Sequence, residues 1–366
     1  MKLNQLAGLR GICAWWVVFF HSLELMQASI PRPVARFLSE GYLAVDLFFL
    51  LSGFVIFLSY HASLMKNFPQ SVGKFYWNRF ARIYPLHVVM LGGYLLLFAA
   101  FHFFSSSGSA PASYTWSAFF QSLFLVHMWV GSDLTWNVPS WSISSEWFVY
   151  LFFPLMAYGL RKMRGGVPVH LLTIAAAALL LYLIYTASGT ASLGADIPRM
   201  ALVRTLLEFL MGVLIGSLYV NHKDFLEKYR NLSLAGFVVL CTLYAGTSLA
   251  DYTIIPVAFA FLIAYLSVTS SWITRTLSHP WLVYLGEISY STYMVHYLIY
   301  DLLKAGFVAR DGSVNPVYVW LSFVVVFLLS VALHHAVDSP SQHYFRRLST
   351  RKATERGSVV LIDGKN

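Results

Sequence analysis

The sequence predicts an all-α, polytopic integral membrane protein with about ten transmembrane helices and both termini in the cytoplasm. Of the 366 residues 58% are apolar and only 11% are charged, whereas charged residues make up about 25% of soluble globular domains. Apolar stretches recur along the chain, and Lys and Arg gather in alternate connections between them. The polar surface that would coat a soluble protein is therefore missing.

Ten apolar stretches are long enough to cross a bilayer, which takes about 20 mostly apolar residues. They cover residues 9–27, 41–60, 84–104, 140–160, 168–186, 199–220, 232–249, 253–270, 282–304 and 317–338. The first contains an Arg and a His and has no clear small-residue cleavage site after it, which indicates a retained helix and not a signal peptide. A further stretch, Trp116–Val130, has about 15 residues and is too short to cross untilted, so we expect an interfacial or re-entrant helix there.

The basic residues indicate the orientation of the chain, because cytoplasmic segments of membrane proteins accumulate Lys and Arg. With the N-terminus inside, 19 of the 25 Lys and Arg residues fall in cytoplasmic segments and 6 on the outer side. A crossing by residues 116–130 would invert every later segment and remove this bias. The distribution therefore favours ten spans and two cytoplasmic termini.

The chain reads as one membrane domain, residues 1–345, followed by a basic, polar cytoplasmic tail, residues 346–366. The formal charge of +9 does not indicate nucleic acid, since the basic residues lie between apolar stretches and no RNP or zinc-finger pattern accompanies them. Membrane lipids are the expected partner of these charges. No GxGxxG, P-loop, HExxH or CxxC array is present, so nothing supports a metal or a bound cofactor.

Arg10 and His21 fall on one face of the first predicted helix, because eleven residues at 100° each come within about 20° of three whole turns. Arg10 lies near the cytoplasmic mouth and His21 about 16 Å further along. A cation at the entrance and an imidazole deep in the membrane suit an anionic substrate that arrives from the cytosol. The alternative is a His that packs against a neighbouring helix and an Arg that reaches the lipid headgroups.

Four titratable side chains from four predicted helices share one depth. Counted from the outer boundary at helical rise, Asp46 lies about 7 Å deep, Glu146 and His21 about 9 Å, and His296 about 12 Å. Ionisable groups inside a membrane are costly and usually functional. We therefore expect these four groups to line a common water-filled cavity.

In such a cavity His21 would suit a general base for a sugar hydroxyl. Asp46 or Glu146 would hold its imidazole, as a carboxylate does in a catalytic triad. Asp46 could instead contact a helix start or pair with a structural Arg, and His296 could form a hydrogen bond between helices. Three hydroxyl groups could position the substrate or the acyl oxygen, those of Ser142, Ser144 and Tyr293.

Arg79 and Arg82 are three residues apart in the segment before the third span, on one face of an expected short helix. Two guanidinium groups beside aromatic residues suit the phosphates of a nucleotide-containing thioester, and they suit anionic lipid headgroups equally well.

Arg204 and Glu208 form an i, i+4 pair with glycines following at helix-packing spacing, and we interpret this segment as structural.

Taken together, these residues resemble the acyltransferase family 3 membrane proteins, which O-acylate bacterial polysaccharides, lipopolysaccharide, Nod factors and some macrolides. The resemblance runs from LRGICAWWVVFFH through VDLFFLLSGFVI, FYWNRFARIYPLH, WSISSEWFVYLFFPL, RTLLEFLMGVLIG and GEISYSTYMVH to VDSPSQHYFRR, and covers nearly the whole chain. The family's usual Glu before Pro near the end appears here as Asp338 before Ser339-Pro340. The SGNH hydrolase-like domain found in some members does not follow, which suggests a stand-alone enzyme.

The resemblance implies an O-acyltransferase of the bacterial inner membrane, with acetyl-CoA or another acyl-CoA as donor and a glycan or glycoside as acceptor. It implies that Arg10 and His21 are the essential pair of the first motif, that Arg79 and Arg82 are the RxxR of the cytoplasmic segment, and that Glu146 is the membrane carboxylate. Together with the residue arguments above, this predicts a catalytic centre of His21, Glu146 and Asp46. The predicted substrate- or donor-binding residues are Arg10, Arg79, Arg82, Trp141, Ser142, Ser144, Tyr293 and His296. A transporter of lipid-linked sugars or small anions would use similar buried charges and is the alternative function.

Overall fold

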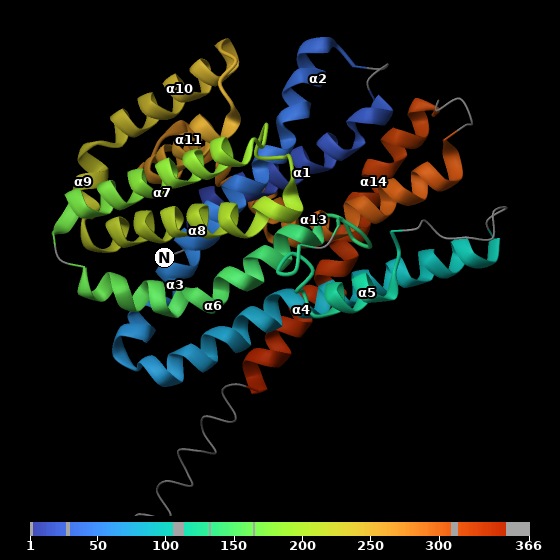
Figure 1. The fold of residues 1–366 in the computed structure, drawn as a ribbon, viewed down its shortest axis with the longest axis horizontal. Coiled ribbons are helices and arrows are strands. Elements are labelled where there is room, and N and C mark those ends of the chain that lie inside the picture. The colour runs from blue at the N-terminus through green and yellow to red at the C-terminus, as the bar shows by residue number, and fades with distance from the viewer. Residues whose placement is uncertain are drawn as a thin grey trace, which may run out of the picture.

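The computed structural model describes residues 3–26, 30–104, 113–131, 133–163, 165–308 and 314–348. All regular elements in these ranges are helical, which confirms the all-α prediction. Most of the long helices run side by side along the long axis of the molecule (Figure 1). They are α1 (Asn4–Met26), α2 (Arg32–Ser39), α3 (Ala44–Lys66), α4 (Phe68–Phe104), α5 (Trp116–Leu123), α6 (Ser140–Lys162), α7 (Gly166–Ser188), α8 (Ile197–Asn221), α9 (Lys223–Lys228), α10 (Arg230–Gly246), α11 (Asp251–Val268), α12 (Trp272–Leu277), α13 (Pro280–Phe307) and α14 (Pro316–Leu333), with a 3₁₀ turn at Glu40–Leu43 and a π-helical turn at His334–Asp338.

Within the described ranges, eight helices are long and apolar enough to cross a membrane. The other two predicted spans are also helical: α10 has 17 residues, and α13 has 28 residues but carries three charged groups, Glu287, Asp301 and Lys304. The segment predicted not to cross contains only α5, eight residues long or about 12 Å at helical rise. The chain is thus a helical membrane domain, and its sidedness stays a prediction. Of the expected tail, residues 349–366 lie outside the described ranges.

The segment before the third span differs from its expected form. We expected a connecting loop with a short helix, but α4 is one helix of 37 residues with Pro85 inside it. At 1.5 Å per residue it is about 55 Å long, well beyond the hydrocarbon thickness of about 30 Å. Its polar first half looks like a loop in the sequence, yet packing against α3 and α6 keeps it helical, and this extension carries Arg79 and Arg82.

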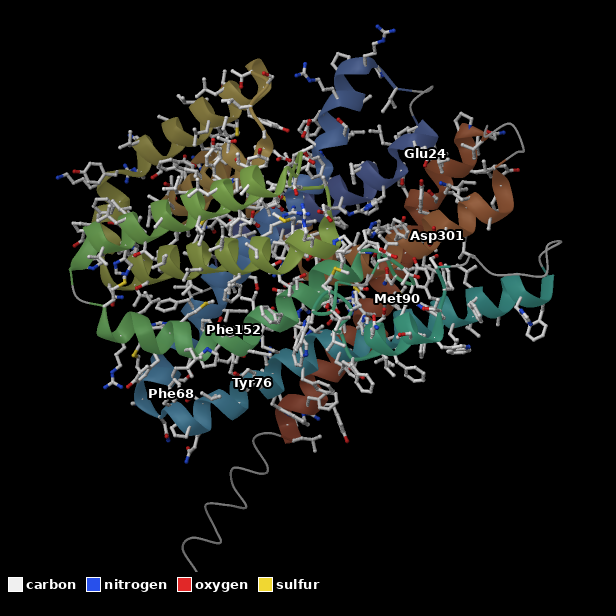
Figure 2. All side chains as sticks on the ribbon, in the orientation of Figure 1. Glu24, Phe68, Tyr76, Met90, Phe152 and Asp301 are labelled. Atoms are coloured by element: carbon white, nitrogen blue, oxygen red, sulfur yellow. The ribbon has the colours of Figure 1, made fainter. Side chains whose placement is uncertain are left out.

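The two ends of the bundle can be told apart by labelled residues. Figure 2 shows Glu24 and Asp301 toward one end and Phe68 at the other, and we name these the Glu24 end and the Phe68 end. The N-terminus and the junction of α3 with α4 lie toward the Phe68 end (Figure 1), and only Asn67 separates these two helices.

Glycines bring two pairs of helices into backbone contact. A Cβ atom on Gly286 of α13 would lie 1.9 Å from the carbonyl oxygen of Ala7 on α1. In the second pair, a Cβ on Gly53 of α3 would lie 2.1 Å from the carbonyl oxygen of Phe209, and one on Gly212 of α8 would lie 2.0 Å from that of Leu50. Small residues that let helix backbones meet are typical of membrane bundles. The structural interpretation of the glycines in α8 is therefore confirmed, and the two pairs frame the site described next.

Candidate active site

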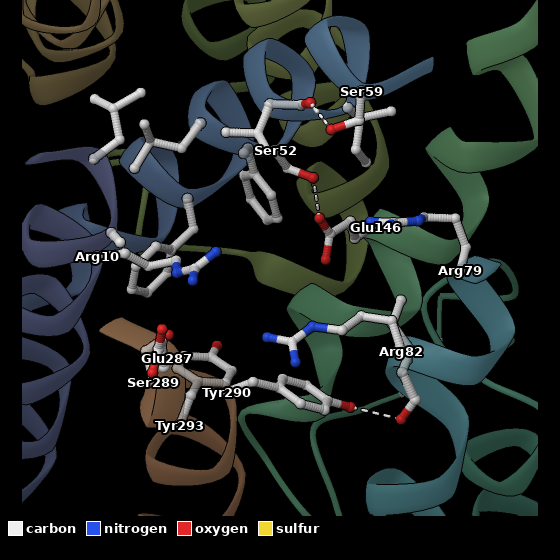
Figure 3. Close-up of a pocket in the computed structure, with 18 of the residues that line it drawn as sticks. Arg10, Ser52, Ser59, Arg79, Arg82, Glu146, Glu287, Ser289, Tyr290 and Tyr293 are labelled. Atoms are coloured by element: carbon white, nitrogen blue, oxygen red, sulfur yellow. Dashed lines mark hydrogen bonds between the residues drawn. The ribbon is translucent and has the colours of Figure 1, made fainter. Parts of the chain in front are cut away.

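A cavity of about 640 Å³ lies between the α1–α13 pair on one side and α3, α4 and α6 on the other. Its wall reaches from Asn4 and Ser59, near the Phe68 end, to Ser142 and Tyr293 further inside. Figure 3 shows Arg10 and Arg82 pointing toward each other across it. Five charged side chains line the cavity, those of Arg10, Arg79, Arg82, Glu146 and Glu287.

Arg10 is held by the backbone of the neighbouring helix. Its Nε and one Nη donate to the carbonyl oxygen of Gly286 at 3.2 and 2.8 Å. The contact is possible because the two helices touch at Gly286, where no side chain stands between them. A carbonyl partner fixes the direction of the guanidinium group and leaves its positive charge uncompensated. Arg10 therefore faces the cavity as a positioned cation.

Arg82 is held by an acid from the C-terminal part of the chain. Its Nη1 donates to both carboxylate oxygens of Asp338, at 3.1 and 2.8 Å, and Asp338 is buried. Asp338 also contacts His334 Nδ1 at 3.1 Å and accepts from Gln342 Nε2 at 2.9 Å. Asp338 is the last residue of the π-helical turn that follows α14, and short π-helical segments often occur at functional sites. Asp338, which stands where the family usually has Glu, thus holds Arg82 at the cavity.

Arg79 differs from Arg82 in its partners. Its Nη2 lies 3.4 Å from the hydroxyl of Tyr60, and its guanidinium carbon lies 5.4 and 5.9 Å from the rings of Tyr60 and Tyr150. Within the described residues it has no carboxylate partner, and its Nε is buried without a hydrogen bond. Aromatic faces stabilise a cation without neutralising it. Arg79 is therefore a charged donor available to an anion in the cavity.

Glu146 is the carboxylate at the centre of the cavity wall. It accepts a short hydrogen bond from Ser52 Oγ, and the same hydroxyl lies 3.4 Å from the hydroxyl of Tyr150. Sequence reasoning singled out Glu146 but missed Ser52 and Glu287, which line the same cavity. The signal for Glu287 was present, since it is a carboxylate near the start of a predicted span, directly after the glycine that binds Arg10.

Asp46 does not lie where we expected it. Its two carboxylate oxygens accept from Nε and Nη2 of Arg204 at 2.5 and 2.7 Å, and both side chains are almost fully buried. The glycine contact between α3 and α8 brings these two residues opposite each other. The expectation that Asp46 orients His21 is therefore wrong, and the alternative of a structural Arg partner is correct. Trp141, expected in substrate binding, instead packs its ring 5.3 Å from the Arg204 guanidinium and does not line the cavity.

The i, i+4 pair expected between Arg204 and Glu208 is also absent from the described contacts. Arg204 is bonded to Asp46 and, through Nη1, to the carbonyl oxygen of Leu193 at 2.6 Å. Both oxygens of Glu208 are buried without a hydrogen-bond partner. The partner of Arg204 is thus Asp46 on the neighbouring helix and not Glu208 one turn away, because α3 approaches α8 closely enough for two-point binding.

His21 and His296 contact each other, and neither contacts a carboxylate among the described residues. Nε2 of His296 lies 3.1 Å from Nδ1 of His21, and Nδ1 of His296 lies 2.7 Å from the carbonyl oxygen of Tyr293. Nδ1 of His21 is also 3.1 Å from the carbonyl oxygen of Val17. The shared depth of the two histidines was visible in the sequence. Their pairing was not, because nothing in one sequence shows that α1 lies against α13.

The three expected hydroxyls separate into two environments. Ser142 and Tyr293 both line the cavity, with their oxygens 2.8 Å apart, and the Tyr293 hydroxyl also lies 3.1 Å from the carbonyl oxygen of Pro139. Ser144 is buried elsewhere: it donates to the carbonyl oxygen of Leu125 and accepts from the backbone N–H of Met128. Ser144 therefore fixes the segment after α5 and has no atom in the cavity wall.

The prediction that the four titratable groups line a common cavity is wrong. Only Glu146 lines it, whereas Asp46 belongs to a buried ion pair and the two histidines lie beyond the cavity wall. Tyr293 connects the cavity with the histidine pair. Its hydroxyl lies in the cavity and its carbonyl oxygen binds His296, one helical turn further along α13.

The described chain is a helical membrane domain with an arginine-lined cavity and a nearby pair of histidines, and comparison with known proteins identifies its family. A family model described as an acyltransferase domain matches residues 3–335. The chain belongs to this family, acyltransferase family 3, and with it to the O-acyltransferases of membranes. No solved structure matches.

Individual relatives cover the chain to different extents. Acyltransferase MdmB of Streptomyces mycarofaciens is 28% identical over 95% of this chain and 93% of its own length. A protein of Staphylococcus aureus strain MRSA252 whose name includes O-acetyltransferase is 24% identical over 97% of this chain, which spans 59% of that relative. A Rhizobium radiobacter relative, protein 2 in the picA locus, is 40% identical over 86 residues, 24% of this chain and 40% of that protein.

Proposed function

We propose that this protein transfers an acyl group, most simply acetyl, from cytoplasmic acyl-CoA to a hydroxyl group of a cell-surface or exported glycan. The observation that carries this proposal is the cavity with three guanidinium groups, two of which, Arg10 and Arg79, have no carboxylate partner among the described residues. Guanidinium groups bind phosphate oxygens in two-point contacts, and acyl-CoA carries several phosphates. A volume near 640 Å³ is within the range of small-molecule sites, about 300–1,000 Å³.

The charge distribution supports one direction of transfer. We assign the Phe68 end to the cytosol of a bacterium, because the positive-inside rule places the segments with most Lys and Arg there. The phosphates of the donor would then bind at Arg79, Arg82 and Arg10, and its thioester arm would extend past Tyr293 toward His21. From Arg10 to His21 the path along α1 is about 16 Å.

The acceptor would arrive from the Glu24 end. Two hydrogen-bonded pairs of a phenol and a carboxylate lie there: the Tyr300 hydroxyl donates to Glu24 at 2.7 Å, and the Tyr94 hydroxyl donates to Asp301 at 3.2 Å. Carboxylates and phenols beside aromatic rings suit a hydroxyl-rich acceptor such as a glycan. Acceptors of this class include lipid-linked sugars, polysaccharides and small glycosides.

In the proposed reaction His21 takes the proton of the acceptor hydroxyl as its oxygen attacks the thioester carbonyl. The new C–O ester bond forms, the C–S bond breaks, and the proton passes from His21 to the departing sulfur of CoA. A two-step variant, in which His21 first carries the acyl group, gives the same products. Both variants require an unprotonated ring nitrogen on His21.

The test measures thiol release from acetyl-CoA by the purified protein in detergent, with a panel of glycan and glycoside acceptors. His21→Ala should lower turnover at least about 100-fold, as loss of a general base does. The matched control is His61→Ala, since His61 contacts the carbonyl oxygen of Phe57 and does not line the cavity. Wild-type turnover in His21→Ala would refute the mechanism, and liposome flux of sugars without any acyl donor would favour a transporter.

A further inference from the structure

We propose that His296 is a positioning residue that fixes the tautomer of His21, so that Nε2 of His21 carries the lone pair that accepts the substrate proton. The two rings lie 3.1 Å apart between Nε2 of His296 and Nδ1 of His21. The inference deepens the proposed function and rests on it for the role of His21. The hydrogen-bond geometry that supports it involves no substrate.

The hydrogen on His296 can be placed first. Its Nδ1 lies 2.7 Å from the carbonyl oxygen of Tyr293, and a carbonyl oxygen only accepts, so Nδ1 carries a hydrogen. His296 is 2% exposed and contacts no carboxylate among the described residues, and an unpaired charge is costly to bury. The ring is therefore neutral with a single hydrogen. Its Nε2 is left with a lone pair.

The hydrogen on His21 follows from that lone pair. Nε2 of His296 can only accept, so Nδ1 of His21 must donate across the 3.1 Å contact. The carbonyl oxygen of Val17, also 3.1 Å from Nδ1 of His21, imposes the same requirement. One N–H shared between two acceptors is a common three-centre arrangement. Both partners thus place the hydrogen of His21 on Nδ1 and its lone pair on Nε2.

The free nitrogen of His21 is accessible. Nε2 has no hydrogen bond to the described residues, and it is not among their buried polar atoms that lack a partner. Phe20 and Tyr297 pack edge-on to the ring at 4.9 and 5.1 Å between centroids, which restricts how it can turn. Nε2 therefore stands open while Nδ1 is held.

The arrangement gives a base without a buried carboxylate. When Nε2 of His21 takes the acceptor proton, the ring becomes positively charged and its Nδ1–H bonds to His296 and Val17 strengthen. His296 keeps its own hydrogen on Nδ1, bonded to Tyr293, throughout the step. It occupies the place that a carboxylate has in a serine-hydrolase triad, where the third residue sets the tautomer of the base.

The experiment compares His296→Gln with His296→Leu in the full-length protein. The side-chain oxygen of Gln can accept from Nδ1 of His21, and Leu cannot. The readout is the protonation pattern of His21 in ¹⁵N-histidine-labelled protein in detergent, observed by NMR and assigned with His21→Ala. We expect a hydrogen on Nδ1 in the wild type and in His296→Gln, and a mixture of tautomers in His296→Leu. A hydrogen on Nε2 of His21 in the wild type would overturn the proposal. A protonation pattern in His296→Leu identical to that of the wild type would also overturn it, because the carbonyl oxygen of Val17 would then be sufficient to fix the tautomer.

Turnover provides the second readout. We expect kcat to fall about tenfold or more in His296→Leu and to recover to within about threefold in His296→Gln, while KM for acetyl-CoA stays unchanged because the arginines are untouched. A rise in KM with unchanged kcat would overturn the positioning role. The protein could show the predicted tautomers and yet release no thiol with any acceptor. That result would support the role of His296 and refute the proposed function, so failure of one proposal can be told from failure of the other.

Discussion

Nη1 of Arg82 donates to both carboxylate oxygens of Asp338, 256 residues further along the chain, at 3.1 and 2.8 Å. This contact joins α4 to the turn that follows α14, so a helix remote in sequence fixes one cation of the cavity. A charge-assisted hydrogen bond of this kind contributes about 1.5–3 kcal/mol.

For Asp338→Asn we expect KM for acetyl-CoA to rise about tenfold with a small change in kcat, because Arg82 loses its fixed direction while the transfer step is untouched. Asp338→Glu keeps the charge and should recover much of the affinity. Steady-state kinetics in detergent give both constants. An unchanged KM in Asp338→Asn would show that Arg82 does not need the carboxylate.

Arg79→Gln should weaken binding of CoA about tenfold, since this cation lacks a carboxylate partner among the described residues and is free to bind phosphate. Calorimetry with CoA alone measures this without any acceptor. The matched control is Arg275→Gln, because Arg275 is exposed on α12 and does not line the cavity. Equal affinities of the two variants would contradict the donor site.

Asp46→Asn should destabilise the protein by about 1.5–3 kcal/mol, because the buried Arg204 guanidinium would lose its charge-assisted, two-point contact with Asp46. Denaturant unfolding in detergent measures the loss. Asp224→Asn, an exposed change on α9, is the control and should have little effect. If Asp46→Asn keeps wild-type stability but loses turnover, Asp46 acts in catalysis and its structural assignment fails.

Gly212→Ala should destabilise the protein by about 1–3 kcal/mol, because the new Cβ would lie 2.0 Å from the carbonyl oxygen of Leu50 and must push α3 and α8 apart. Gly246→Ala is the control, since no atom lies within 4 Å of its Cβ position. Thermal unfolding of the two variants should differ clearly. Equal stability would mean that the two helices can separate without cost.

The sequence was sufficient to predict the membrane helices, because an apolar stretch must satisfy its backbone hydrogen bonds internally to enter a membrane. The sequence was less informative for the first half of α4, which is polar but still helical. Packing maintains the helix there, and composition does not indicate it. Helical periodicity and depth identified Arg10, His21, Glu146 and His296 one by one. The partners of these residues depend on which helices touch.

Helix adjacency is a long-range property that composition and spacing do not contain. Asp46 and Arg204 are 158 residues apart in the sequence, and His21 and His296 are 275 apart. Asp46 was one of two acids considered as the partner of His21, because the three residues have similar depths. Many residues share a depth in the membrane, whereas few are in contact. The small residues where backbones meet, such as Gly212 and Gly286, are the local signs from which such contacts can be inferred.

The backbone contact at Gly286 has a mechanical consequence. Arg10 and His21 belong to α1, their partners Gly286 and His296 belong to α13, and the two helices meet without intervening side chains. We expect such a pair to move as one rigid body, whereas the opposite cavity wall is built on α3, α4 and α6. A shift of that wall on ligand entry would then leave the distance between the two histidine rings unchanged.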